Sequence, residues 1–311
     1  MPVATRRRPV PLVIAGALAI ALVALGGGLW ALTRFGPVDR DPAQEAPVRE
    51  PSRVMIAGDS MTQGANGDWT WRYHLWNHLA PHVDDLDFVG PYSDPATRDM
   101  MFPVPTAEDD GSGASREPTD PSATGWPGAD GDPATVEYRD PGFDQDHNAL
   151  WGRTLLDALG SIEEEVRVHQ PDVLCVMIGV NDLLWPVEPE EMERRLRDYV
   201  EAARRGNPDL RVVVAEALPI ALTETDEGFA LRVYAYNEIV REVAADLTTA
   251  ASPVVSVNVA GTDGWDPAVD AYDGTHPNSG GELKIAAAFA DALSIQFGMG
   301  PAYPRPLSAT T

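Results

Sequence analysis

A serine between two glycines is the first residue whose setting suggests chemistry. Ser60 lies in the segment 58–64 (GDSMTQG), which directly follows the apolar run 54–57. The glycines allow a sharp turn and leave room around the hydroxyl. A serine hydroxyl is a weak nucleophile unless a base takes its proton and donors hold the oxyanion formed by its attack. The segment therefore predicts a strand that ends in a tight turn carrying a nucleophile, if the chain supplies a base and those donors.

The far end of the chain offers the base. Asp273 and His276 are separated by two residues in the segment 273–277 (DGTHP). An imidazole can accept a serine proton and return it to a leaving group, and a neighbouring carboxylate fixes its tautomer. A short turn of this kind can place both side chains on one side. No comparable setting surrounds the remaining histidines, which are His74, His78, His82, His147 and His169.

A third segment, 179–182 (GVND), follows the apolar run 173–178. These three segments, in this order, resemble the SGNH (GDSL-type) hydrolase family over about residues 53–297, with Met61 where the family often has leucine. The resemblance implies that Ser60 is the nucleophile, His276 the general base and Asp273 the residue that orients the base.

The resemblance also implies an oxyanion hole. Its donors would be the Asn181 side-chain amide and the backbone N–H groups of Ser60 and of one further glycine. Gly152 is the candidate for that glycine because it lies between the first and third segments and just before a predicted helix. Trp151 precedes it, where the family commonly has small residues.

The implied activity is that of a serine esterase or lipase. A carboxylic ester would be hydrolysed through an acyl-enzyme without a cofactor, and its substrate would be a small-molecule, glycan or lipid ester. The same residues would also serve an O-acyltransferase that acts on a glycan or lipid hydroxyl. A cell-surface binding module without activity is an alternative from another class, and the intact set of Ser60, Asn181, Asp273 and His276 speaks against it.

Short apolar runs alternate with amphipathic stretches along residues 53–298. Leu155, Leu159, Ile162 and Val166, for example, recur at helical spacing. Strands are predicted at 53–57, 86–89, 173–178, 211–216 and 254–258, and helices at 69–80, 154–169, 189–205, 229–249 and 279–296.

Strands separated by helices predict an α/β domain with a three-layer, doubly wound, mostly parallel five-stranded sheet. This is the flavodoxin-like fold that the SGNH resemblance implies. Ligands of such sheets bind at the carboxyl ends of the strands. Ser60 and Asn181 both follow strands, so we expect them at the same edge.

Residues 91–147 interrupt this pattern with many Pro, Gly, Asp and Glu residues. Such a long loop inside a domain is usually functional or disordered. We interpret it as a partly ordered lid or rim over the site, docked through Phe102, Trp126 and Tyr138. Its acidic turns do not match a twelve-residue calcium loop, and no His/Cys spacing fits zinc, so no metal is predicted.

The N-terminus predicts a membrane anchor. Residues 1–8 include three arginines and would be cytoplasmic, and the uncharged stretch 9–33 is long enough to span a bilayer once. A linker, 34–52, would then connect it to a hydrolase domain, 53–298, on the outer side of the membrane, followed by a tail, 299–311. A cleaved signal peptide, which would give a secreted protein, is the alternative.

The overall composition excludes some classes of binding partner and predicts where the cysteine and the tryptophans lie. The net charge of −25 argues against nucleic acid, whose phosphates require Lys and Arg. The single cysteine, Cys175, excludes an intramolecular disulfide and is expected to be buried in an apolar strand. The tryptophans Trp69, Trp71 and Trp76 are expected to pack in the core or its rim. The sequence does not indicate an oligomeric state.

Overall fold

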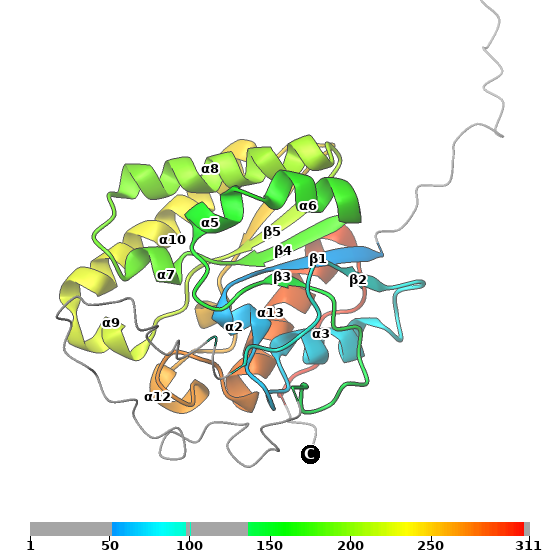
Figure 1. Ribbon diagram of the computed structural model, residues 1–311, viewed down its shortest axis with the longest axis horizontal. Helices are drawn as coiled ribbons and strands as arrows, with labels where there is room; N and C mark the ends of the chain where they lie inside the picture. Colours follow the sequence, from blue (N-terminus) through cyan, green and yellow to red (C-terminus); the bar gives the residue numbers. More distant parts are fainter. Residues whose placement is uncertain (1–51, 98–99, 101–135, 308–311) are drawn as a thin grey trace, which may run out of the picture. The chain divides into compact units, whose positions relative to one another are not determined.

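A parallel sheet forms the centre of the fold (Figure 1). The structure, a computed structural model, describes residues 52–97, 100 and 136–307. Strand order is β2-β1-β4-β5-β6, and every pair along it is parallel. The strands are β1 (Arg53–Gly58), β2 (Asp87–Val89), β4 (Val173–Met177), β5 (Arg211–Ala215) and β6 (Val254–Val257). All five predicted strands are therefore present, and the predicted α/β fold is confirmed.

A sixth strand, β3 (Asn148–Ala149), is not predicted by the sequence. It pairs with the carboxyl-terminal half of β1, whereas β2 pairs with the amino-terminal half. Two residues are too few to show strand alternation, so the sequence carries no signal for β3. The pairing of β3 with β1 places the segment just before Gly152 beside the end of β1.

Helices cover both faces of the sheet (Figure 1). On one face, α3 (Trp71–Leu79) packs against α13 (Ser279–Phe297). The other face carries α5 (Leu155–Leu159), α6 (Ile162–His169), α8 (Pro189–Gly206) and α10 (Glu227–Leu247). Shorter helices follow the strand ends, namely α2 (Ser60–Gln63), α7 (Val180–Leu183), α9 (Ala221–Thr225), α11 (Val259–Thr262) and α12 (Pro267–Asp270).

The single helix predicted over 154–169 is two helices, α5 and α6. Gly160 and Ser161 separate them. The Ser161 hydroxyl accepts a hydrogen bond from the Arg153 guanidinium at 2.7 Å, which fixes the break in place. Periodicity alone does not reveal such a break because the apolar spacing continues across it.

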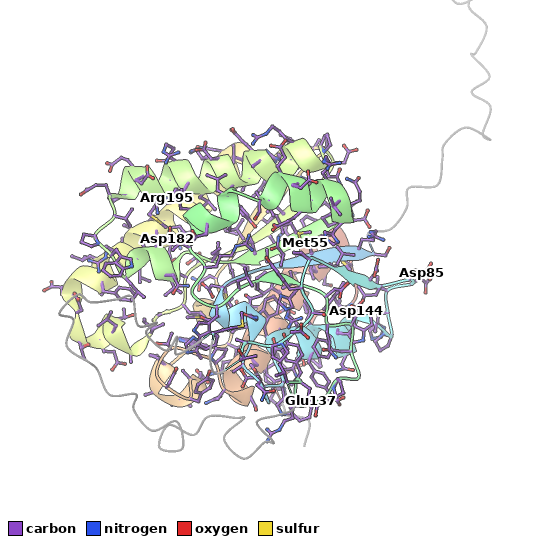
Figure 2. All side chains as sticks on the ribbon, in the orientation of Figure 1. Met55, Asp85, Glu137, Asp144, Asp182 and Arg195 are labelled. Atoms are coloured by element: carbon purple, nitrogen blue, oxygen red, sulfur yellow. The ribbon has the colours of Figure 1, made fainter. Side chains whose placement is uncertain are left out.

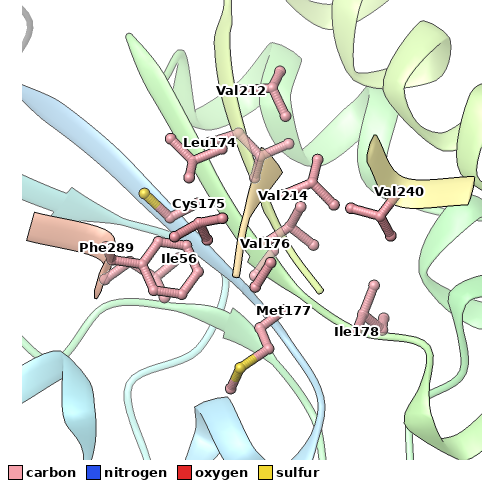
Figure 3. Close-up of a cluster of buried hydrophobic side chains, with 14 of the residues drawn as sticks. Ile56, Leu174, Cys175, Val176, Met177, Ile178, Val212, Val214, Val240 and Phe289 are labelled. Carbon is pink, nitrogen blue, oxygen red and sulfur yellow. The ribbon is translucent and has the colours of Figure 1, made fainter. Parts of the chain in front are cut away.

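The core lies between the sheet and the helices on both faces, as Figure 3 shows for the side chains around β4. Ile56, Cys175 and Phe289 are fully buried there. Cys175 lies in β4 at 0% exposure, so the expectation of a buried cysteine is confirmed, and burial raises the pKa of its thiol. Trp71 is also buried, stacked on Phe289 with ring centroids 4.6 Å apart. Trp76 packs edge-on against Phe88, so the expected packing of these two tryptophans is confirmed as well.

The described ends of the loop 91–147 dock on the domain. Ala96 pairs with Ala65, and Glu137 exchanges hydrogen bonds with the turn at Asn66 and Gly67. Tyr138, one of the predicted docking residues, is buried. Phe102 and Trp126 lie outside the described residues, as does the predicted anchor 9–33. Among the residues that are described, no helix is both long and apolar enough to cross a membrane.

Candidate active site

Ser60 begins α2 directly beyond the carboxyl end of β1. The Asp59 side chain caps this short helix by accepting from Met61 N at 3.1 Å. Gly58 makes the tight exit from the strand possible. A Cβ at this position would lie 2.4 Å from Thr62 Oγ1 and 2.5 Å from the Met177 carbonyl oxygen. The serine is therefore held on a turn that tolerates no side chain at the preceding strand end.

A hairpin-like loop carries Asp273 and His276. Tyr272 N donates to the His276 carbonyl at 3.0 Å, which closes the loop. Asp273 Oδ1 accepts from the backbone N–H groups of Thr275 and His276, at 2.9 and 2.7 Å. Its Oδ2 lies 2.7 Å from His276 Nδ1. One carboxylate thus fixes both the backbone of the turn and the orientation of the imidazole.

The surroundings keep Asp273 ionised. Its partial burial alone would raise the pKa of the carboxyl group. The hydrogen bond and charge of His276, together with the two backbone N–H donors, outweigh the burial and lower the pKa below its ordinary value.

The imidazole reaches Ser60 from a distance of 216 positions along the chain. His276 Nε2 lies 2.9 Å from Ser60 Oγ. Ser60, His276 and Asp273 therefore form one hydrogen-bonded series at the edge of the sheet. Such an arrangement can transfer the hydroxyl proton to nitrogen while the carboxylate stabilises the imidazolium.

Asn181 lies in α7, beyond the end of β4. Its Nδ2 donates to the Arg153 carbonyl at 3.0 Å. Gly179, which precedes α7, has a φ of 117°, and a Cβ there would lie 2.7 Å from the ring of Tyr236. A glycine is therefore required for this approach. The neighbouring Asp182 accepts from Leu155 N at 2.7 Å, which ties α7 to the start of α5.

Asp182, which is itself buried, also forms an ion pair with the partly exposed Arg195. Its Oδ1 lies 2.8 Å from Arg195 Nη1 of α8, and the two labelled residues lie together between α7 and α8 in Figure 2. The aspartate is thereby paired at both oxygens, which is what a buried carboxylate requires. Through Asp182, the segment that carries Asn181 is fixed to two helices.

Gly152 lies in the turn between β3 and α5, with a φ of 75°. Among the described residues, a Cβ here would meet nothing within 4 Å, so the space beside the backbone is open. The hydrogen bond from Asn181 to the Arg153 carbonyl joins this turn to α7. The structure thus brings the segments of Ser60, Gly152, Asn181, Asp273 and His276 to one edge of the sheet.

Two aromatic rings beside the histidine are not predicted by the sequence. The Trp151 indole stacks on the His276 imidazole, with centroids 4.3 Å apart and planes inclined by 21°. The Tyr272 ring stacks at 5.8 Å. The one sequence feature that could have indicated the stacking is Trp151 itself, which directly precedes the predicted oxyanion glycine, Gly152. No helical or strand period in that segment indicates where the ring points.

Two buried carboxyl groups, Asp68 and Glu282, lie close to one another, and Asp68 is near enough to Asp273 to be affected by its charge. Asp68 Oδ2 accepts from Ala65 N at 2.6 Å, and Glu282 Oε1 accepts from Thr70 N at 2.9 Å. Burial raises the pKa of Asp68 to about 7, and the negative charge of Asp273 adds to the increase. Burial and the charge of Asp68 raise the pKa of Glu282 as well. Within the part of the chain that the structure describes, no three His, Cys, Asp or Glu side chains are grouped to hold a metal ion.

The sheet order, the helices on both faces and the serine–histidine–aspartate series define a class of α/β protein with these three residues hydrogen-bonded at the carboxyl edge of a parallel sheet. The profile of the GDSL-like Lipase/Acylhydrolase family matches residues 115–282, more than half of the chain. The chain belongs to this family and is a serine ester hydrolase of the GDSL type. The matched segment contains Gly152, Asn181, Asp273 and His276 but begins after Ser60. The hydrogen bond to His276 connects Ser60 to it.

Solved structures of esterases share the fold. A carbohydrate esterase family 3 protein from Talaromyces cellulolyticus is 25% identical, with a TM-score of 0.55 over 76% of this chain and 94% of that chain. An acetyl esterase mutant with acetate ion is 24% identical, with a TM-score of 0.55 over 76% and 93%. A family 3 carbohydrate esterase from Clostridium thermocellum is 20% identical, with a TM-score of 0.54 over 80% and 99%. A comparison with curated proteins gives no match.

The raised pKa of Asp68 predicts a pH-dependent stability. Below the ordinary pKa of 3.8 both the folded and the unfolded chain hold the proton, whereas between that value and about 7 only the folded protein keeps it. The free energy of unfolding should therefore fall as the pH rises through this window. Asp68→Asn retains an oxygen for Ala65 N and carries no charge, so it should remove part of this decrease.

Denaturant unfolding at about pH 4.5 and about pH 7.5 measures the effect, which should be on the order of 1 kcal/mol or more. Asp209→Asn, at an exposed carboxylate, is the matched control and should leave the difference between the two pH values unchanged. The same pH dependence in wild type and Asp68→Asn would contradict the prediction.

Proposed function

We propose that this protein hydrolyses a carboxylic ester with Ser60 as nucleophile, His276 as general base and then general acid, and Asp273 as the group that orients and stabilises the imidazolium. The observation that carries the proposal is the continuous series of hydrogen bonds from Ser60 Oγ through His276 to Asp273. Each residue also has the surroundings that its role requires. The serine is on a rigid turn, and the aspartate is held ionised.

In the first half of the reaction, Ser60 Oγ attacks the ester carbonyl carbon and its proton passes to His276 Nε2. The tetrahedral intermediate collapses when Nε2 gives the proton to the leaving alcohol, which leaves an acyl group on Ser60. In the second half, water attacks the acyl carbon and loses a proton to Nε2. Release of the carboxylic acid returns that proton to Ser60 Oγ.

The oxyanion would be held by three donors, namely the Asn181 Nδ2 amide and the backbone N–H groups of Ser60 and Gly152. The amide group has two hydrogens, and one of them serves the Arg153 carbonyl. That bond fixes the amide plane and leaves the second hydrogen for a ligand. Donors fixed before the reaction stabilise developing charge without reorganisation.

A short acyl group on a carbohydrate is the substrate class that the comparisons support best. The similar solved structures include carbohydrate esterases and an acetyl esterase with acetate ion. p-Nitrophenyl esters with acyl chains of different length, together with an acetylated oligosaccharide, test this class. Acyl transfer to an added alcohol, measured by product analysis, would instead support the O-acyltransferase alternative.

We also propose that the protein acts outside the cytoplasm, held by residues 9–33 and separated from the membrane by residues 34–52. The arginines before the uncharged stretch support this orientation. Sequencing the N-terminus of protein extracted from membranes tests the anchor. A mature chain that starts between about Thr33 and Val54 would contradict it and support a cleaved signal peptide.

The triad should behave as one unit. Ser60→Ala and His276→Ala should each lower kcat by roughly 10⁴-fold or more, and the double variant should be hardly worse than either one. Asp273→Ala should be milder, because it removes the carboxylate that orients and stabilises the imidazolium and leaves the serine and the histidine that exchange the proton. Steady-state ester hydrolysis measures all four variants.

His82→Ala, at an exposed histidine outside the site, serves as the control and should keep full activity. A fluorophosphonate should label Ser60 in the wild type. Full activity in Ser60→Ala, with labelling at another residue, would overturn the proposed mechanism.

Asn181→Ala should lower kcat by roughly 10²–10³-fold with little change in KM, because the lost donor acts mainly in the transition state. Asn207→Ala is a matched control, since Asn207 Nδ2 also donates to a backbone carbonyl, that of Pro171, at 2.8 Å. It lies before β5, at the amino end of the sheet, and should leave kcat unchanged. An unchanged kcat in a folded Asn181→Ala variant would exclude Asn181 from the oxyanion hole.

Gly152→Pro is not a useful companion variant, because proline cannot adopt the φ of 75° found at Gly152.

A further inference from the structure

Gln63, the last residue of α2, connects the nucleophile helix to the turn of Gly152. It lies one helical turn after Ser60, and its side chain is buried. Its Oε1 accepts from Trp151 N at 2.7 Å, and its Nε2 donates to the Asp94 carbonyl at 3.3 Å. Both ends of the carboxamide are therefore in use, so its orientation is defined.

The backbone of Gln63 is itself firmly held. Its carbonyl accepts from the buried guanidinium of Arg72 at 3.2 Å and from the Tyr138 hydroxyl at 2.8 Å. Arg72 also donates to the Thr62 carbonyl at 3.0 Å. These bonds satisfy the last carbonyl groups of α2, which have no partner within so short a helix. Gln63 thus projects its carboxamide from a fixed position relative to Ser60.

Asn181 holds the end of the turn that receives this bond, because its Nδ2 donates to the Arg153 carbonyl at 3.0 Å. Residues 150–152 have few other restraints. Leu150 N donates to the Gly58 carbonyl at 3.3 Å, a long hydrogen bond, and Arg153 N donates back to Leu150 within the turn. Gly152 is open on the side where a Cβ would lie. The bond from Trp151 N to Gln63 is the shorter of the two that join residues 150 and 151 to the nucleophile segment.

Two groups of the site depend on where this turn lies. One is the Gly152 N–H, which is the proposed oxyanion donor. The other is the Trp151 indole, stacked on His276 at 4.3 Å. A displacement of about 1 Å at a catalytic group can reduce a rate by roughly 10²-fold. The position of the Gln63 carboxamide therefore affects both the proposed oxyanion donor and the ring that packs against His276.

We propose that Gln63 is a positioning residue of this ester hydrolase, which holds the Trp151–Gly152 turn in register with Ser60 so that the Gly152 N–H points to the oxyanion. The inference rests on the proposed function. It assigns Gln63 a role in the transition state through Trp151 N, beyond a packing role in the fold.

Gln63→Met in the full chain tests the proposal. Methionine has nearly the length of glutamine, so it fills the buried space, but it offers no strong acceptor to Trp151 N. We expect kcat to fall roughly 10- to 100-fold with KM within about two-fold, because a misplaced oxyanion donor is felt mainly in the transition state. Gln63→Glu keeps an oxygen facing Trp151 N and should be at least about five-fold more active than Gln63→Met.

The rate is divided by the number of active sites that a fluorophosphonate labels. A lower kcat of folded enzyme is thereby distinguished from a smaller fraction of folded enzyme. Gln170→Met is the matched control, because Gln170 Nε2 donates to the Arg167 carbonyl at 2.9 Å, just before β4 at the opposite edge of the sheet. It should keep the wild-type kcat.

Three results would overturn the inference: a kcat per site within about two-fold of wild type in Gln63→Met, an equal loss in Gln170→Met, or a Gln63→Glu variant no more active than Gln63→Met. Full activity in Ser60→Ala would instead refute the proposed function, so the two failures are distinguishable.

Discussion

The parallel pairing of β1 with β4 is the constraint on which the site depends. Val54 pairs with Val173 and Gly58 with Met177, so the two strands end side by side. A shift by one residue would turn every side chain of a strand to the other face of the sheet. These strands are buried on both faces, which makes the register costly to change. Ser60 and Asn181 follow directly, so their proximity is a consequence of the core rather than of the loops.

Close packing at the strand ends then restricts the two turns. A Cβ at Gly58 would collide with Thr62 and the Met177 carbonyl, and one at Gly179 would collide with Tyr236. The Tyr236 hydroxyl in turn donates to the Ile178 carbonyl at 3.0 Å, at the end of the strand segment. Because these contacts leave little room for movement, the Ser60 hydroxyl and the Asn181 amide can keep a defined geometry on otherwise short helices.

Several titratable groups beside the site are buried, and hydrogen bonds offset the effect of burial to a different degree for each. Arg72 is fully buried and donates to the Thr62 carbonyl and to the Tyr138 hydroxyl. Burial raises the pKa of Asp59 to about 7, and the charge of Asp182 adds to this, against the hydrogen bond from Met61 N. Ionising such groups costs stability near neutral pH. Asp273 differs from these groups, because its three hydrogen bonds stabilise the ionised carboxylate.

The sequence by itself determined the class of fold and the principal candidates of the site. Apolar runs and helical spacing placed the five main strands and the main helices, because burial imposes a period that is visible along the chain. Ser60, Asn181, Asp273 and His276 could be named because their three segments, in this order, resemble those of the SGNH family. The sequence could not show β3, the break between α5 and α6, the stack of Trp151 on His276 or the hydrogen bond that Trp151 N donates to Gln63. Each of these depends on contacts between segments that are distant in sequence, or on elements too short to have a period. Only the tertiary structure decided them, because the parallel sheet determines which chain segments meet at its edge.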